Sequence, residues 1–437
     1  MLKRLFPPTS QVADATEPSG PVSVLLREAE YPAPFPHALE YSAPCRGTWN
    51  IVHTGMRIPG THQIFICASG CLRGVVLTAA EMGLMGRFST LELHENDLTG
   101  RDNEMLIIEG VTDILARLPY RPRAILLFPA CVHHFLGCNL RFVYQTLRKR
   151  FPDIAFAECF MDPIRQTRHL KPEERLRRAI GRLLPELPKE KQVSIFGNNL
   201  KTDRDSDFVK LLQAGGFAIR DMSDCQSYDE FQKLGASRLN LYTNPFSVPA
   251  VQDMKKRLQQ YFFYLPQTWN FTEIAVLLKE LAAKLGLPCP DFSHEQAKAE
   301  KTLQKARALV GSTPLALDLS FTFRPFGLAR LLCEHGFAVT KIYSDTVSPE
   351  EEEDFRWLQQ HRGDMELWQT KAPLLRVLKR PAAPQDGKPA LLALGQKAAY
   401  FNNTPYFVNL VEGGGRWGFA AVQKLALDMM TAYKQPK

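Results

Sequence analysis

The sequence lacks the features that would place a protein in a membrane or in the secretory pathway. No segment approaches the ~20 consecutive apolar residues of a membrane span. The opening MLKRLFPPTS contains no apolar run long enough for a signal peptide. A phosphate-binding loop of the GxxxxGK[ST] kind is also missing. We therefore expect a soluble, cytoplasmic protein with no membrane partner, in which any energy coupling comes from outside the chain.

The chain also has little excess of one sign of charge over the other. The 54 basic and 46 acidic residues leave a net charge of only +8 over 437 residues. The basic residues are spread along predicted helices such as 173–184, where they indicate solvated helix faces. Because nucleic-acid binding usually requires a concentrated basic patch, we expect no nucleic-acid partner.

Apolar residues, in contrast, are plentiful and occur in a repeating order. They make up 45% of the chain, and at ~100–200 residues per domain the length predicts two to four domains. Predicted strands and helices alternate strictly, and the order restarts after the polar linker 187–192 and again near residue 314. Such alternation predicts an α/β fold of three Rossmann-like domains, each a parallel sheet covered by helices. The expected divisions are an extended N-terminal arm at 1–43 and domains at 44–188, 189–311 and 312–437.

Cysteine is distributed unevenly. Five of the nine cysteines lie within residues 45–138. Thiols stay reduced in the cytoplasm, so a group of cysteines there indicates a metal site or catalysis rather than disulfides. Cys225, Cys289 and Cys333, outside this region, fit small buried side chains.

Three of the grouped cysteines occupy positions where ligands are expected. Cys71 and Cys131 follow the predicted strands 62–67 and 124–130, and open α/β sheets bind ligands beyond the carboxyl ends of their strands. Cys45 lies in an irregular segment, where core packing does not require a cysteine.

These residues leave three hypotheses open. One is a structural zinc site, and another is simple burial of the cysteines as apolar side chains. The third is an iron–sulfur cluster held by three thiolates, since soft thiolate ligands select such clusters. The ligands of the zinc site would be Cys67 and Cys71 together with Cys131 and either Cys138 or one of the histidines His133 and His134.

The spacings and short motifs point to one of these hypotheses. Cys71 lies 26 residues after Cys45, and Cys131 lies 60 residues after Cys71. Cys71 closes a Ser-Gly-Cys before a predicted helix, and Cys131 is followed, after five residues, by Gly137. Together with an acidic segment at 95–106 and a Gly-rich turn at 413–418, these motifs resemble the nitrogenase component 1 family, of the molybdenum–iron protein type.

The resemblance implies a ligand set. Cys45, Cys71 and Cys131 would hold an iron–sulfur cluster at the interface of two related subunits. Three thiolates leave a four-iron (4Fe-4S) cube one ligand short, and two chains together could bind a larger, P-cluster-like species. Cys67 and Cys138 are then either additional metal ligands or small buried side chains.

The resemblance also implies partners. A separate homodimeric, ATP-dependent Fe-protein-like reductase would deliver electrons. The chain would form a homodimer, or a heterodimer or heterotetramer with a paralogous subunit, and would pass electrons to a small-molecule substrate in the interdomain cleft.

His133 and His134 are catalytic candidates that could hydrogen-bond a cluster sulfur or transfer a proton, or simply begin a helix. Asn244 is a candidate by position only.

Two departures from the family pattern narrow the expected activity. Asn244 stands where the alpha subunits carry a cofactor-binding cysteine, and the segment 398–410 contains no histidine. Dinitrogen reduction on an iron–molybdenum cofactor is therefore not expected. We expect instead an oxidoreductase similar to the dark-operative protochlorophyllide reductase or to the nickel-tetrapyrrole reductive cyclase. The alternatives are a scaffold for nitrogenase cofactor assembly and, from another class, a zinc-stabilised binding protein.

Overall fold

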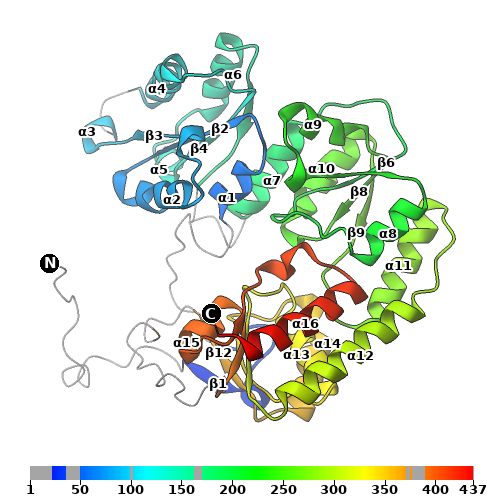
Figure 1. The fold of residues 1–437 in the computed structure, drawn as a ribbon. Helices are drawn as coiled ribbons and strands as arrows, with labels where there is room; N and C mark the ends of the chain where they lie inside the picture. Colours follow the sequence, from blue (N-terminus) through cyan, green and yellow to red (C-terminus); the bar gives the residue numbers. More distant parts are fainter. Residues whose placement is uncertain are drawn as a thin grey trace, which may run out of the picture.

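Three separate sheets, each covered by helices, form the protein (Figure 1). The structure is a computed structural model, and it describes residues 22–35, 50–98, 102–161, 170–370, 375 and 389–436. Two of the sheets are wholly parallel, and the third is parallel except for one edge strand. The predicted α/β fold class is confirmed.

The first sheet has the strand order β3-β2-β4-β5. Its strands are β2 (Thr61–Cys67), β3 (Phe88–Glu92), β4 (Ala124–Pro129) and β5 (Ala155–Glu158). Both central strands, β2 and β4, are buried along their whole length, as expected for a parallel sheet covered on two faces. Successive residues of β2 enter different cores, because side chains alternate across a strand. Phe65 packs in one core and Ile64 and Ile66 in the other.

Helices cover both faces of this sheet. The helices on one face are α1 (Ile51–Met56), α2 (Ser69–Glu81) and α7 (Pro172–Arg182), and those on the other are α4 (Asn103–Arg117) and α6 (Leu140–Arg150). Helix α7 packs against α10 (Val248–Leu258) as well as against α1. It therefore lies between the first and the second sheet.

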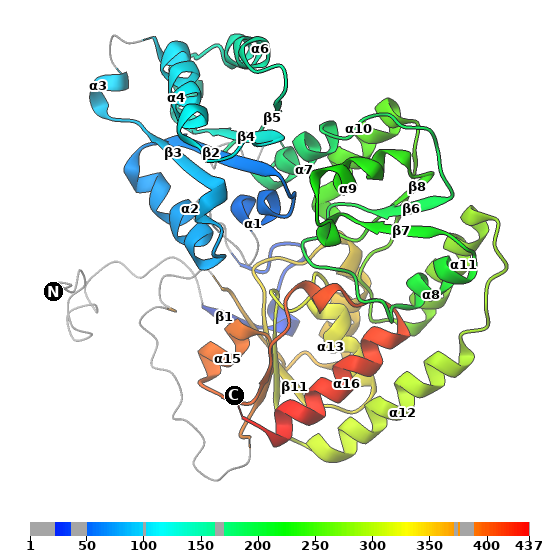
Figure 2. The ribbon, with the colours of Figure 1, turned by 45° about the horizontal axis from the view of Figure 1, so that its top comes forward.

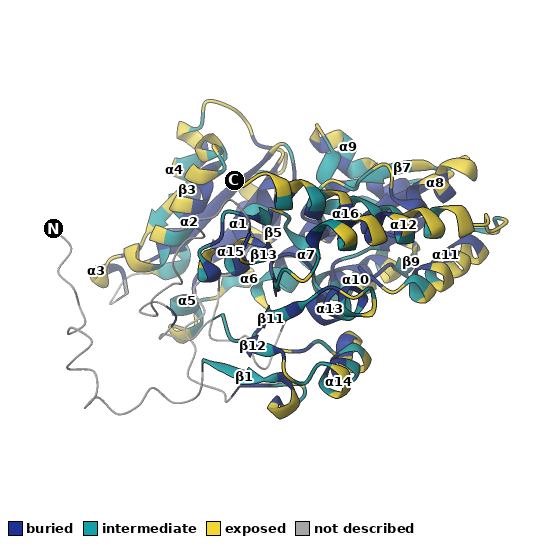
Figure 3. Ribbon diagram, turned by 60° about the horizontal axis from the view of Figure 1, so that its bottom comes forward, coloured by how far each residue is buried: buried dark blue, intermediate teal, exposed yellow. Residues whose placement is uncertain are grey.

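The second sheet has the order β7-β6-β8-β9. Its strands are β6 (Gln192–Ile195), β7 (Ala218–Asp221), β8 (Leu239–Tyr242) and β9 (Tyr261–Tyr264), and its further helices include α8 (Asp207–Ala214), α9 (Tyr228–Gln232) and α11 (Phe271–Leu285). One continuous hydrophobic core runs from this sheet into the third. The long helix α12 (Ser293–Val310) packs along α16 (Phe419–Lys434) of the third sheet (Figure 2). The outer face of α12 is exposed, whereas the strands are mostly buried (Figure 3).

The third sheet has the order β1-β12-β11-β10-β13-β14. Its strands are β1 (Ser23–Leu25), β10 (Leu315–Asp318), β11 (Val339–Tyr343), β12 (Glu366–Trp368), β13 (Leu392–Leu394) and β14 (Phe407–Val408), with α13 (Pro325–Glu334), α14 (Glu352–His361), α15 (Gln396–Asn402) and α16 beside them. Strand β1 comes from the predicted N-terminal arm and pairs antiparallel with β12, Ser23 opposite Trp368. This part of the arm thus completes the edge of the third sheet.

The local structure differs from prediction at two helix starts. Helix α2 begins at Ser69, so that Cys71 lies in its first turn, whereas the sequence predicted a turn there and a helix only from residue 72. A short helix, α5 (Cys131–Phe135), follows β4 almost at once, at a position where the sequence predicted no helix. It ends before Gly137, whose φ of +68° is a left-handed conformation that favours glycine. In the described part of the chain, no helix has both the length and the apolar character needed to cross a membrane.

Candidate functional site

Two of the three predicted cluster ligands lie at the carboxyl edge of the first sheet. Strands β2 and β4 are hydrogen-bonded neighbours that run parallel, with Ile66 opposite Pro129. Cys71 follows β2 in the first turn of α2, and Cys131 follows β4 as the first residue of α5. Both cysteines are partly buried and neither forms a disulfide. The third predicted ligand, Cys45, lies outside the described residues.

The two candidate extra ligands have different settings. Cys67 is the last residue of β2 and lies in the hydrophobic core with Phe65, 1% exposed. Cys138 packs in the core on the opposite face of the sheet from Cys71. Burial, together with the charge of Glu104, raises the pKa of the Cys138 thiol to about 12. A small buried side chain is the role that these two settings favour.

The described residues do not assemble a zinc site. All six of the residues proposed as zinc ligands are described, but the described part of the chain contains no group of three or more His, Cys, Asp or Glu side chains that could hold a metal ion. The same observation leaves the iron–sulfur hypothesis open, because that hypothesis requires Cys45.

The two histidines beside Cys131 point to different surroundings. His133 is buried, and its Nδ1 lies 3.1 Å from both the N–H and the carbonyl oxygen of Ala130. Burial lowers the pKa of His133. Its Nε2 is also buried and has no hydrogen-bond partner among the described residues. The ring of His134 stacks on Phe160, with 5.5 Å between the centroids. An orphaned ring nitrogen two residues after Cys131 is consistent with a further group at this edge, since buried polar atoms are normally hydrogen-bonded.

Asn244, the third catalytic candidate, is held in a structural role. It is buried just beyond β8, and its Oδ1 accepts a hydrogen bond from the N–H of Phe246 at 3.0 Å. This bond closes the turn that leads into α10, so the amide oxygen caps a turn.

A buried charged cluster, which the sequence did not predict, joins the three sheets. Arg177 of α7 is 1% exposed, although the sequence predicted that the basic residues of this helix form a solvated face. That prediction is wrong for Arg177, because α7 has neighbours on two sides. The guanidinium donates to the carbonyl oxygen of Gly197 at 3.1 Å and to Oδ1 of Asn199 at 2.9 Å. Asn199 in turn donates to Glu412 at 3.0 Å and accepts from Thr54 at 3.2 Å.

Glu412 is the most unusual member of this cluster. Its φ is +44°, which is rare for a residue other than glycine, and the positive φ values continue through Gly413, Gly414 and Gly415. Backbone N–H groups of Glu412 and Gly413 donate to the carbonyls of Ser320 and Phe321, which fixes the turn against the third sheet. A cavity of about 40 Å³ adjoins the Glu412 side chain, which is room for little more than water.

The pKa of Glu412 makes a testable contribution to stability. Burial raises this pKa from 4.5 to about 7, against the opposing effects of Asn199 and Arg177. The folded protein therefore binds this proton more tightly than the unfolded chain, so stability falls as the pH rises from about 4.5 to about 7. We expect Glu412→Gln to be about 1–3 kcal/mol more stable than the wild type at pH 8, with no difference at pH 4, below the pKa of the unfolded chain. Urea denaturation at the two pH values measures this, and parallel pH profiles for both proteins would contradict it.

Comparisons with known proteins agree with this architecture. Three parallel-rich sheets covered by helices, in this order, define an α/β protein of the nitrogenase component 1-like fold. The family model for nitrogenase component 1 type oxidoreductases matches residues 52–380. The chain belongs to this family, as its motifs predicted. Members typically bind iron–sulfur clusters and pair with a reductase and with paralogous subunits.

Two solved structures are similar to the chain over most of its length. The structure described as "Nitrogenase Cp1 at pH 6.5" has a TM-score of 0.65, with 91% of this chain and 94% of that chain covered. The structure described as "Nitrogenase Cp1 at pH 5" has a TM-score of 0.56, with 91% of each chain covered. Both are 13% identical in sequence, so the similarity is one of fold. No curated protein sequence matches.

Proposed function

We propose that this chain is a subunit of a nitrogenase-like oxidoreductase that relays electrons through an interfacial iron–sulfur cluster. Cys45, Cys71 and Cys131 are its proposed ligands. The observation that carries the proposal is the position of Cys71 and Cys131 at the carboxyl ends of two adjacent parallel strands, in a chain of this family. A separate ATP-dependent Fe-protein-like reductase supplies the electrons, and a small molecule in the interdomain cleft receives them.

The residues around the cysteines suit such a cluster. When bound, it supplies one-electron transfer at a potential set by its charge, its hydrogen bonds and its exposure to solvent. Thiolates are the ligands it requires, and two are partly exposed at this edge. The Nε2 of His133 offers a buried N–H when Nδ1 accepts from the N–H of Ala130. A donor of this kind stabilises the reduced form of a cluster.

A role in dinitrogen reduction on a molybdenum cofactor is not part of the proposal. Asn244 uses its Oδ1 to hold the N–H of Phe246, and an amide oxygen does not replace a thiolate as a ligand of iron. An organic substrate, as in the reductases that the sequence resembles, suits this chain better.

An apolar patch beside the cysteines supports pairing with a second subunit. Phe135 and Leu136 at the end of α5 are exposed, by 72% and 43%. Phe142 of α6 and Met105 of α4 are also exposed, and a hydrogen bond from the N–H of Asn139 to the Glu104 side chain joins the starts of these two helices. Exposed apolar patches of this kind mark protein–protein interfaces.

Replacing Phe135 with aspartate should weaken this association. The contact then loses an aromatic anchor, and the new carboxylate must be desolvated for the subunits to associate. We therefore expect the dimer dissociation constant to rise about tenfold or more. Analytical ultracentrifugation of the purified subunit, with its paralogue if the partner is not identical, measures the constant. The matched control is Tyr400→Asp on α15, an exposed aromatic of the third domain. Equal effects of the two substitutions would place the interface elsewhere.

Anaerobic purification of the whole chain tests the cluster itself. We expect the broad visible absorbance of an iron–sulfur cluster, with iron and acid-labile sulfide in equal amounts. A colourless protein with one zinc per chain would contradict the proposal. Addition of the reductase with ATP then separates an enzyme from an assembly scaffold. Reoxidation of the cluster by a substrate indicates turnover, whereas transfer of the intact cluster to an acceptor protein indicates a scaffold.

A further inference from the structure

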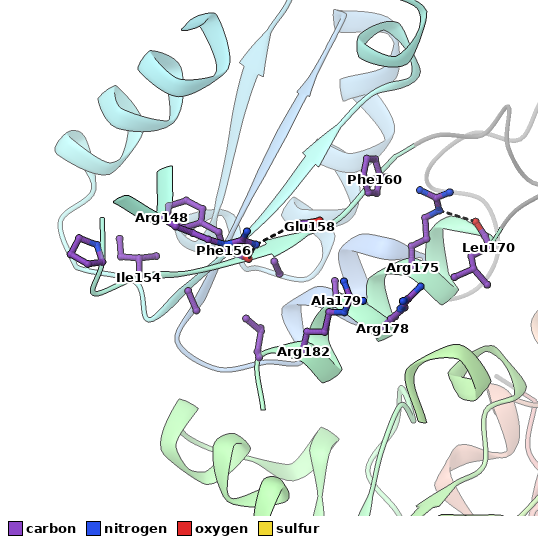
Figure 4. Close-up of a pocket in the computed structure, with 14 residues that line it drawn as sticks. Arg148, Ile154, Phe156, Glu158, Phe160, Leu170, Arg175, Arg178, Ala179 and Arg182 are labelled. Atoms are coloured by element: carbon purple, nitrogen blue, oxygen red, sulfur yellow. Dashed lines mark hydrogen bonds and ion pairs between the residues drawn. The ribbon is translucent and has the colours of Figure 1, made fainter. Parts of the chain in front are cut away.

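A groove of about 600 Å³ lies between the edge strand β5 and helix α7 (Figure 4). Four arginines line it: Arg148, Arg175, Arg178 and Arg182. Among the described residues that line the groove, Glu158 is the one acidic side chain. The volume is within the range of ~300–1,000 Å³ that is typical of small-molecule sites.

The positive charge on the α7 side of the groove is only partly neutralised. Arg178 and Arg182, one helical turn apart, both contact Oδ1 of Asp253, at 3.3 and 3.0 Å. Arg257 lies 3.9 Å from the other oxygen of the same carboxylate. One negative charge therefore faces three guanidinium groups. The side chains of Arg178 and Arg182 remain 41% and 50% exposed, so they can reach a ligand.

The rest of the groove is apolar or aromatic. Its apolar lining residues include Ile154, Phe156, Ala157, Phe160, Ala179 and Leu183. The Arg175 guanidinium lies over the Phe160 ring, 5.0 Å from its centroid, and donates to the carbonyl of Leu170 at 3.2 Å. An apolar floor with guanidinium groups along its rim suits a molecule that has an apolar body and acidic substituents, since guanidinium groups bind carboxylates and phosphates through paired hydrogen bonds.

We propose that this groove binds an organic anion with a flat apolar body and at least two acidic groups. The groove offers such a ligand both kinds of contact, because Arg175, Arg178 and Arg182 project from α7, Arg148 projects from α6, and apolar residues of β5 and α7 line it as well (Figure 4). The proposal does not depend on the electron-relay function, although the two sites are neighbours. Phe160 stacks on His134, in the helix that begins at Cys131.

An extended peptide that adds a strand to β5 is a less suitable occupant. The N–H groups of Ala155 and Cys159 donate to the carbonyls of Arg123, just before β4, and of Leu127 within β4. The carbonyl of Phe156 therefore points away from β4, because directions alternate along a strand. Arg148 already donates to that carbonyl at 3.2 Å. The strand has four residues, and short, capped edges are those that proteins protect from further pairing.

Calorimetric titration of the full chain with defined probes tests the proposal. The probes are naphthalene-2,6-dicarboxylate, naphthalene-2-carboxylate, 2-naphthyl phosphate and an acidic decapeptide. We expect the dicarboxylate to bind about tenfold more tightly than the monocarboxylate, because a second charge-assisted pair forms. The phosphate probe distinguishes carboxylate from phosphate as the preferred acidic group. Binding of the peptide alone, or of none of the probes, would overturn the proposal.

Variants connect the binding to the groove. We expect Arg178→Gln with Arg182→Gln to weaken dicarboxylate binding at least about tenfold. Arg117→Gln with Arg150→Gln removes the same charge from α4 and α6, outside the groove, and should leave the binding unchanged. Arg175→Gln does not disturb the Asp253 contacts and should also weaken binding. It tests the groove even if the variant with Arg178→Gln and Arg182→Gln does not fold. Equal loss in groove and control variants, or no loss in either groove variant, would show that the groove is not the site. Iron content, measured in each sample, reports on the proposed cluster separately.

Discussion

Serine in place of Cys71 or Cys131 is expected to remove most of the iron from the purified chain. Each substitution replaces a soft thiolate with a hydroxyl that is a poor ligand for iron–sulfur clusters. We expect iron and sulfide to fall below about a tenth of the wild-type content, since a four-iron cube needs each of its cysteines. Metal and sulfide analysis after anaerobic purification measures the loss, together with the visible absorbance.

Cysteines elsewhere in the chain provide the matched controls. Cys225 lies just after strand β7 of the second sheet and Cys333 lies on α13 of the third, far along the sequence from the cluster residues. Cys225→Ser and Cys333→Ser should retain the full iron content. Full iron in Cys71→Ser, with circular dichroism unchanged in all variants, would remove Cys71 from the ligand set.

Among the substitutions proposed for stability measurements, Arg177→Met is expected to lower the free energy of unfolding most. The substitution keeps an unbranched side chain but removes the donors to Gly197 and Asn199, and it removes the cation that faces Glu412. Breaking a buried charged network by removing one partner costs about 3–5 kcal/mol. Denaturation by urea, followed by circular dichroism, measures the loss.

An exposed arginine and a second substitution complete this experiment. Arg117, at the end of α4, has a side chain that is 78% exposed, and Arg117→Met should change stability by less than about 0.5 kcal/mol. Glu412→Gln in the Arg177→Met background should recover part of the loss, because residues in one network are coupled. Additive effects of the two substitutions would show that Arg177 and Glu412 act independently.

Much of the fold followed from sequence because its central strands are unambiguous. The runs that became β2 and β4 are apolar, short and followed by helices, so their burial in a parallel sheet was predictable. Helix α5 was not, because five residues that end at a glycine have no periodicity to detect. The sequence also indicated that Cys71 and Cys131 follow the carboxyl ends of strands. That these two ends are adjacent follows from the strand order, in which β2 and β4 are neighbours. The role of Cys45 stays a prediction.

The buried charged cluster could not be predicted in the same way. Arg175, Arg177 and Arg178 stand close together in one basic helix, and nothing in the local sequence separates the buried Arg177 from the other two, which are partly exposed. Burial of Arg177 follows from partners that lie 20 or more residues away, the carbonyl of Gly197 and the side chain of Asn199. The Glu412 turn shows the same limit. Its glycines were visible in the sequence, but the buried carboxylate beside them depends on three sheets meeting.

The pairing of β1 with β12 has a consequence for biosynthesis. Residues 23–25 leave the ribosome early, but their strand partners at 366–368 are translated more than three hundred residues later. During elongation, domains form from the N-terminus onward, so the first sheet can close while this leading segment still waits without its neighbour. The third domain is then completed by joining a segment made before the first domain to strands made after the second, and a chain truncated before residue 366 leaves β1 without a strand to pair with.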